Sequence, residues 1–175
     1  MIILIAGDFC ERYRVEDQLR HKAYKSLFGQ IMPLLSDADY SIVNFEMPIA
    51  EGNGRPICKC GPCLKGSSAA IDALKYAGFS CCTLANNHTL DQGEQCGLNT
   101  KALIEKAGLD TVGFGKDEND AAQTLYKQIG EETLAVINCC EHEFSVATRE
   151  TAGTNGLNPV RQYRAIQEAR ENATM

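Results

Sequence analysis

Short apolar runs alternate with longer stretches of helical periodicity along this chain, which is the pattern of an alternating strand and helix protein. The first apolar run, I-I-L-I-A, predicts a buried strand that ends in a polar turn at Gly7 and Asp8. Predicted strands lie at residues 2–6, 40–46, 79–85 and 110–113, followed by a hairpin that turns at 130–132.

Helices are expected between these strands. Residues 10–24 are strongly charged and predict an exposed loop with some helix, and the next helical face is interrupted by Pro33. Ser67 and Ser68 are candidate caps of a helix that stops at Gly78. Further helices are expected near 97–107, ending at Gly108, and from Asn158-Pro159 onward, whereas 47–66 is rich in Pro and Gly and predicts a long loop.

This order of elements indicates an α/β fold with a mostly parallel sheet. The chain has 175 residues and is 44% hydrophobic, which is enough for one domain with a core. The net charge of -6 disfavours a nonspecific nucleic-acid binder, which needs a basic face. No apolar stretch approaches the length of a membrane-spanning helix, and the start of the chain lacks the features of a signal peptide, so the expected location is cytoplasmic by default.

Polar residues with ligand chemistry follow three of the predicted strands. Asp8 follows the first strand, Glu46 ends the second, and Asn87 and His88 follow the third. In open α/β sheets, ligand sites form beyond the carboxyl ends of the strands, so these side chains are expected to converge. Their oxygen and nitrogen donors suit Mg, Mn, Fe or Zn. Each residue alone has a simpler interpretation as a turn former.

The same segments resemble a known family. The stretches G-D at 7–8, D-Y-S-I-V-N-F-E at 39–46, G-F-S-C-C-T-L-A-N-N-H-T-L-D-Q-G at 78–93 and A-G-L-D-T-V-G-F-G at 107–115 resemble the CapA (PGA_cap) family of capsule and poly-γ-glutamate biosynthesis proteins. The resemblance implies a calcineurin-like metallophosphatase fold, a four-layer α-β-β-α sandwich, of which residues 1–175 would be the N-terminal part of a single domain.

The resemblance also implies roles for individual residues. Asp8 would be a metal ligand, Glu46 the carboxylate that bridges two divalent metal ions, and Asn87 a ligand of the second ion. His88 would be the general acid, and Asp91 would orient it. Two further asparagines, Asn44 and Asn86, would contact these residues and orient them without binding metal themselves.

Two departures limit what the chain is expected to do alone. Metallophosphatases usually have a histidine two residues after the first aspartate, where this chain has Cys10. The later histidine ligands of the family have no counterpart, since His21 and His142 lie in charged segments. Weak or absent activity is therefore expected from this chain by itself, or pairing with a second copy that covers an open sheet edge.

The loop at 56–66 is the other chemically notable segment. Cys58, Cys60 and Cys63 could hold zinc or part of an iron–sulfur cluster, although a closed zinc site usually needs a second pair. A reduced loop near the substrate is the preferred interpretation. The nine cysteines of the chain are expected to be reduced thiols.

Three hypotheses follow. The first is a CapA-like protein of capsule or poly-γ-glutamate biosynthesis with a two-metal site of the metallophosphoesterase type. Its reaction would be metal-assisted hydrolysis or transfer at a phosphoester or related bond of a small-molecule or polymer substrate. The second is a non-catalytic binding or assembly subunit of cell-envelope polymer synthesis, with envelope association implied by the resemblance alone. The third is a metal or redox protein built on the cysteines of the 56–66 loop.

Overall fold

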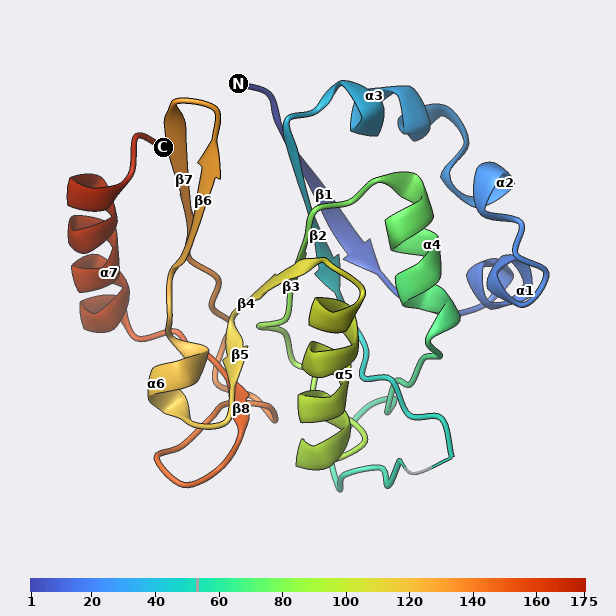
Figure 1. The fold of residues 1–175 in the computed structure, drawn as a ribbon. Coiled ribbons are helices and arrows are strands. Elements are labelled where there is room, and N and C mark those ends of the chain that lie inside the picture. Colours follow the sequence, from blue (N-terminus) through green and yellow to red (C-terminus); the bar gives the residue numbers. More distant parts are fainter. Residues whose placement is uncertain (53) are drawn as a thin grey trace.

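A parallel sheet of four strands forms the centre of the protein, in the order β1-β2-β3-β4 (Figure 1). The computed structural model describes residues 1–52 and 54–175. The strands of this sheet are β1 (Ile3–Phe9), β2 (Tyr40–Phe45), β3 (Cys81–Thr83) and β4 (Asp110–Val112). The α/β class with a parallel sheet, predicted from the apolar runs, is confirmed.

Helices from the first two thirds of the chain cover one face of this sheet. They are α1 (Arg14–Arg20), α2 (Tyr24–Phe28), the 3-10 turn η1 (Gly29–Ile31), α3 (Met32–Asp37), α4 (Ala69–Ala77) and α5 (Glu94–Lys106). Their apolar side chains and the inner face of the sheet form the larger core, centred on fully buried residues such as Phe45, Leu74 and Ile104.

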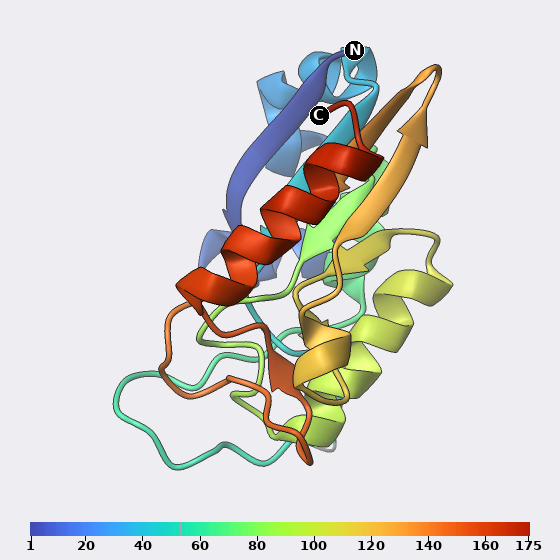
Figure 2. The same ribbon diagram turned by 90° about the vertical axis from the view of Figure 1, so that its left-hand side faces the viewer.

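The opposite face carries an antiparallel hairpin and, outside it, a helix (Figure 2). The hairpin strands are β6 (Leu125–Ile129) and β7 (Glu132–Val136), and the helix is α7 (Pro159–Asn172). Leu134 of the hairpin packs with Tyr40, Ile42, Cys81 and Val112 in a second, smaller core. The resulting order of layers, helix, sheet, hairpin and helix, is consistent with the predicted metallophosphatase-like sandwich.

Two short elements were not predicted from the sequence. They are the strand pair β5 (Phe114–Gly115) with β8 (Gly153–Thr154), and the helix α6 (Glu118–Ala121). Each is at most four residues long, so neither contains enough residues for a hydrophobic period to be recognised.

The interpretation of the first strand as buried is wrong. Because β1 lies at the end of the strand order, it pairs with β2 alone, and Ile5 is 75% exposed. The strand also continues through the expected turn to Phe9, with an irregular register between Ile5 and Asp8. Asp8 therefore lies inside the strand, opposite Asn44.

Two other local expectations are corrected by the structure. The expected helix around Pro33 is divided into α2, η1 and α3, and Leu34 is 59% exposed. Pro33 lies in the first turn of α3, where its missing N–H is tolerated, so a new helix begins there. Ser68 precedes α4 but its side chain accepts no capping hydrogen bond from the helix.

All four strands of the central sheet run in the same direction, so their carboxyl ends share one edge. The long loop that follows β2 also lies at this end of the molecule (Figures 1 and 2). Among the residues described, no helix is long and apolar enough to cross a membrane.

Candidate functional site

Hydrogen bonds connect the carboxyl ends of the first three strands. Asn44 donates from Nδ2 to Asp8 Oδ1 at 2.7 Å. Its Oδ1 accepts hydrogen bonds from Thr83 Oγ1 and from Asn86 Nδ2, both at 3.2 Å. Parallel pairing makes these contacts possible, because the register places Asp8 beside Asn44 and Asn44 beside Thr83. Asn44 therefore fixes the side chain of Asp8 from the neighbouring strand.

Asn86 holds the turn that follows β3. Its Nδ2 also donates to the carbonyl of Phe45 at 3.1 Å, and its Oδ1 accepts from the backbone N–H of His88 at 3.0 Å and from Thr89 Oγ1 at 3.1 Å. The side chain is 8% exposed. Because both polar atoms of its amide form hydrogen bonds to the protein, Asn86 stabilises the turn that carries His88.

Asp8, Glu46 and His88 line one pocket of about 580 Å³ at this edge of the sheet. Partial burial raises the pKa of the Glu46 carboxyl, and the nearby charges of Asp8 and Asp91 raise that pKa further, although His88 opposes them. Negative charge is therefore concentrated at the polar end of the pocket, which favours a cation there.

Cys10 lines the same pocket at the position where the family resemblance leads one to expect histidine. Burial raises the pKa of its thiol to about 11, and the charges of Glu46, Glu11 and Asp8 act in the same direction. At neutral pH the side chain is a neutral thiol, which is a poor ligand until it loses its proton.

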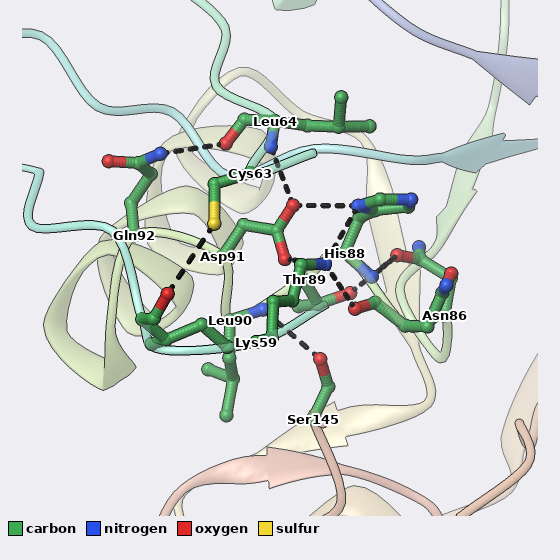
Figure 3. Close-up of polar contacts among 12 residues, drawn as sticks. Lys59, Cys63, Leu64, Asn86, His88, Thr89, Leu90, Asp91, Gln92 and Ser145 are labelled. Atoms are coloured by element: carbon green, nitrogen blue, oxygen red, sulfur yellow. Dashed lines mark hydrogen bonds and ion pairs between the residues drawn. The ribbon is translucent and has the colours of Figure 1, made fainter. Parts of the chain in front are cut away.

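His88 belongs to a buried cluster with Asp91 and Lys59 (Figure 3). His88 Nδ1 lies 2.6 Å from Asp91 Oδ2, and the same oxygen accepts a hydrogen bond of 2.6 Å from the backbone N–H of Leu64. The ammonium group of Lys59 forms an ion pair with Asp91 Oδ1. The Asp91 side chain is 0% exposed and that of Lys59 is 1% exposed. The predicted contact between Asp91 and His88 is therefore present in the structure.

Sequence reasoning missed Lys59. It lies in the loop before α4, 28 residues away from Asn87, whose backbone carbonyl it approaches at 3.4 Å. A lysine between two cysteines in a Pro- and Gly-rich loop carries no periodic signal. Its one distinguishing feature in the sequence is that it is a charged residue between Cys58 and Cys60 of the 56–66 loop.

Asn87, the predicted ligand of a second metal ion, is not among the residues that line the pocket. Its side chain makes no hydrogen bond within the described part of the chain. The two other histidines lie on the surface. His21, which follows α1, contacts the backbone carbonyl of Asp17 in that helix, and His142 contacts the carbonyl of Leu157.

The side chains at the pocket fit a divalent cation in the type of ligand atom and in charge, but they are too few to complete its coordination. Asp8 and Glu46 supply two carboxylates whose mutual repulsion a cation would relieve. However, residues 1–52 and 54–175 contain no group of three or more His, Cys, Asp or Glu side chains placed to hold an ion. The pocket therefore resembles one side of a metal centre.

The cysteine loop does not form a thiolate site in this structure. Cys58 and Cys60 are exposed free thiols, and Cys63 is half-buried, with its Sγ 3.5 Å from the carbonyl of Ile57. These three thiols are not gathered into a metal-binding group in the described ranges. The loop instead contributes Pro62 and Leu64 to the wall of the pocket.

Comparison with known proteins identifies the relatives of this chain. The model of the family described as "Bacterial capsule synthesis protein PGA_cap" matches residues 2–174. The capsule biosynthesis protein CapA of Bacillus anthracis is 25% identical over 98% of this chain and 43% of its own length. A probable polyglutamine synthesis accessory protein of Mycobacterium tuberculosis is 28% identical over 67% of this chain and 31% of its own length. The chain thus spans less than half the length of these curated relatives.

Proposed function

Because the chain belongs to the bacterial capsule synthesis protein family PGA_cap, we propose that it serves in the synthesis of an anionic cell-envelope polymer such as poly-γ-glutamate. The proposed reaction is a metal-assisted hydrolysis or transfer in the pocket at the carboxyl edge of the sheet. The observation that carries this proposal is the convergence of Asp8, Glu46 and His88 on one pocket.

Asp8 and Glu46, with Asn87 as a further donor, would hold divalent metal. A bound divalent ion would supply Lewis acidity toward an oxygen of the substrate and would balance the charge of the two carboxylates. Asn44 keeps Asp8 in place through its hydrogen bond of 2.7 Å. A second ion is part of the proposal on the basis of the family resemblance alone.

His88 would act on the substrate through Nε2. A carboxylate oxygen can only accept a hydrogen bond, so the nitrogen 2.6 Å from Asp91 Oδ2 is the donor. This contact fixes the ring, and it leaves Nε2 as the ring nitrogen that can hold or move a proton toward a leaving oxygen.

Binding of Mn²⁺ tests the proposal. We expect Asp8→Asn and Glu46→Gln each to weaken Mn²⁺ binding by about tenfold or more, measured by calorimetry. The matched control is Asp37→Asn, which neutralises an exposed carboxylate at the far end of α3 and should leave the affinity unchanged. Equal affinities in all four proteins would contradict the carboxylate site.

A non-catalytic binding or assembly subunit is the second candidate. It is favoured by the observation that the described residues contain no group of three His, Cys, Asp or Glu side chains able to hold an ion. Unchanged Mn²⁺ affinity in both site variants, together with wild-type binding of the polymer, would support this candidate over the enzyme.

A further inference from the structure

Lys59 carries a charged side chain that is only 1% exposed and that the proposed mechanism does not use. Its ammonium group forms an ion pair with Asp91, lies 3.2 Å from His88 Nδ1 and lies 5.3 Å from the centre of the Phe144 ring. Burial of a lysine carries a large desolvation penalty unless its charge is matched, so this placement depends on the carboxylate of Asp91.

The two oxygens of Asp91 have different partners. Oδ2 accepts hydrogen bonds from the backbone N–H of Leu64 and from His88. Oδ1 is buried, and its partner in the structure is the ammonium group of Lys59, whose charge stabilises it there. Without that charge, the carboxylate would lose its preferred orientation, and the imidazole that depends on Oδ2 would lose its anchor.

The loop that carries Lys59 is also connected to the segment after His88. The backbone N–H of Ile57 donates to the carbonyl of Asp91 at 3.1 Å, and Gln92 Nε2 donates to the carbonyl of Leu64 at 3.0 Å. Figure 3 shows Lys59, Leu64 and Gln92 around Asp91. Leu64 also lines the pocket. Asp91 therefore holds both His88 and the part of the loop that forms the pocket wall.

We propose that Lys59 is a positioning residue of the site, which acts through Asp91 to hold the His88 ring and the 56–66 loop in their places at the pocket. The consequence for catalysis rests on the proposed function of His88. The positioning itself is a property of the folded chain, and it is tested without any reaction.

The first test uses ¹⁵N-histidine spectra at one fixed pH, in which the three histidines of the chain give three sets of signals. His88→Gln identifies the signal of interest. In the wild type, the Nδ1 proton of His88 should be protected from exchange and strongly deshielded, because it is held in a short hydrogen bond. In Lys59→Met this signal should be lost, while the signals of His21 and His142 stay unchanged.

Two variants act as controls for this result. Lys65→Met removes an exposed lysine of the same loop and should leave the His88 signal as in the wild type. Lys59→Arg keeps a cation at the same position and should restore the protected proton in part. A folded Lys59→Met protein with an unchanged His88 signal would overturn the proposal.

A second measurement requires no destabilised variant. In ¹⁵N-lysine spectra of the wild type, the ammonium of Lys59 should exchange slowly with water and show contacts to the His88 ring, and Lys59→Arg should remove this signal. If every lysine ammonium exchanges at the rate of an exposed group, Lys59 does not hold the cluster and the proposal fails, whether or not Lys59→Met folds.

Turnover separates this proposal from the proposed function. Where the wild type hydrolyses a chromogenic phosphodiester with Mn²⁺, Lys59→Met should lower kcat by about tenfold to a hundredfold with little change in KM or in Mn²⁺ affinity. An unchanged kcat would overturn the catalytic consequence. An inactive wild type with the predicted histidine and lysine spectra would leave the positioning role supported, since weak or absent activity is expected from this chain by itself. The Mn²⁺ affinities of Asp8→Asn and Glu46→Gln would then decide the proposed function separately.

Discussion

At the scale of single residues, two adjacent asparagines differ in burial and in side-chain hydrogen bonding. Asn86 is buried and links β2 to the turn that follows β3 through four side-chain hydrogen bonds. Asn87 is half-buried, and its side chain has no such bonds in the described part of the protein. The doublet therefore combines a residue that holds the fold with one whose side chain makes no hydrogen bond to the described residues.

We expect Asn86→Ala to lower the free energy of unfolding by about 2–4 kcal/mol, because it leaves buried backbone and side-chain groups without partners. Asn87→Ala is the matched control, since it deletes the same amide one position away, and it should change that free energy by less than about 1 kcal/mol. Urea denaturation without added metal measures both values. Equal losses in the two variants would contradict this division of tasks.

At the scale of elements, the N-terminus of α4 is held by carboxylates from other parts of the chain. Glu51 Oε1 accepts hydrogen bonds from the backbone N–H and the hydroxyl of Ser68, at 2.6 and 2.8 Å. Glu11 binds Ser67 in the same manner, with its Oε2 2.6 Å from the backbone N–H. The serines thus donate to glutamates, which join the helix start to the segment between β1 and α1 and to the long loop.

This arrangement predicts a dependence of stability on pH. The hydrogen bond from the Ser68 backbone, followed by that from its hydroxyl, lowers the pKa of Glu51 in the folded protein. The stabilisation is therefore present above the pKa of the unfolded chain, and it is lost as the pH falls through the lower folded value.

Thermal unfolding between about pH 6 and pH 3 tests this prediction. Glu51→Gln should lower Tm near pH 6 and should reduce the loss of stability on acidification. Glu131→Gln, at the exposed turn of the hairpin, is the control and should follow the wild type at every pH. A wild-type pH profile in Glu51→Gln would show that this carboxylate does not hold α4.

At the scale of the whole molecule, the sheet separates two cores of unequal size. The helical side contains most of the buried apolar residues, whereas the hairpin side depends on a cluster of five. Leu134 is the member of that cluster which the hairpin contributes, and it is 6% exposed. The hairpin and α7 therefore form the less strongly attached side of the protein.

Leu134→Ala should lower the free energy of unfolding by about 2–3 kcal/mol, because it removes buried methyl groups and leaves a cavity. Hydrogen exchange should accelerate in residues 125–136 and stay slow in β2 and β3. Glu132→Ala, an exposed position of the same hairpin, is expected to change stability by no more than about 0.5 kcal/mol. Uniform acceleration across the sheet would contradict the view of two separable cores.

Local patterns determined much of this protein from the sequence alone. Apolar runs located β2, β3 and the hairpin, and the Asn158-Pro159 pair located the start of α7, where Asn158 caps the helix. The sequence also indicated that Asp8, Glu46 and His88 would meet, because parallel strands place their carboxyl ends at one edge. In each case the sequence pattern and the strand or helix end that it predicts lie in the same short segment of the chain.

Only the tertiary structure decided the rest, because the deciding contacts join residues far apart in the chain. The strand order put β1 at an edge and exposed Ile5, which no local run of apolar residues could indicate. The burial of Lys59 depends on Asp91, 32 positions later, and the capping of α4 depends on Glu11 and Glu51. A buried charge is stable only beside an opposite charge or hydrogen-bond partner. Folding brings that partner close from a distant part of the sequence, so a local pattern cannot reveal it.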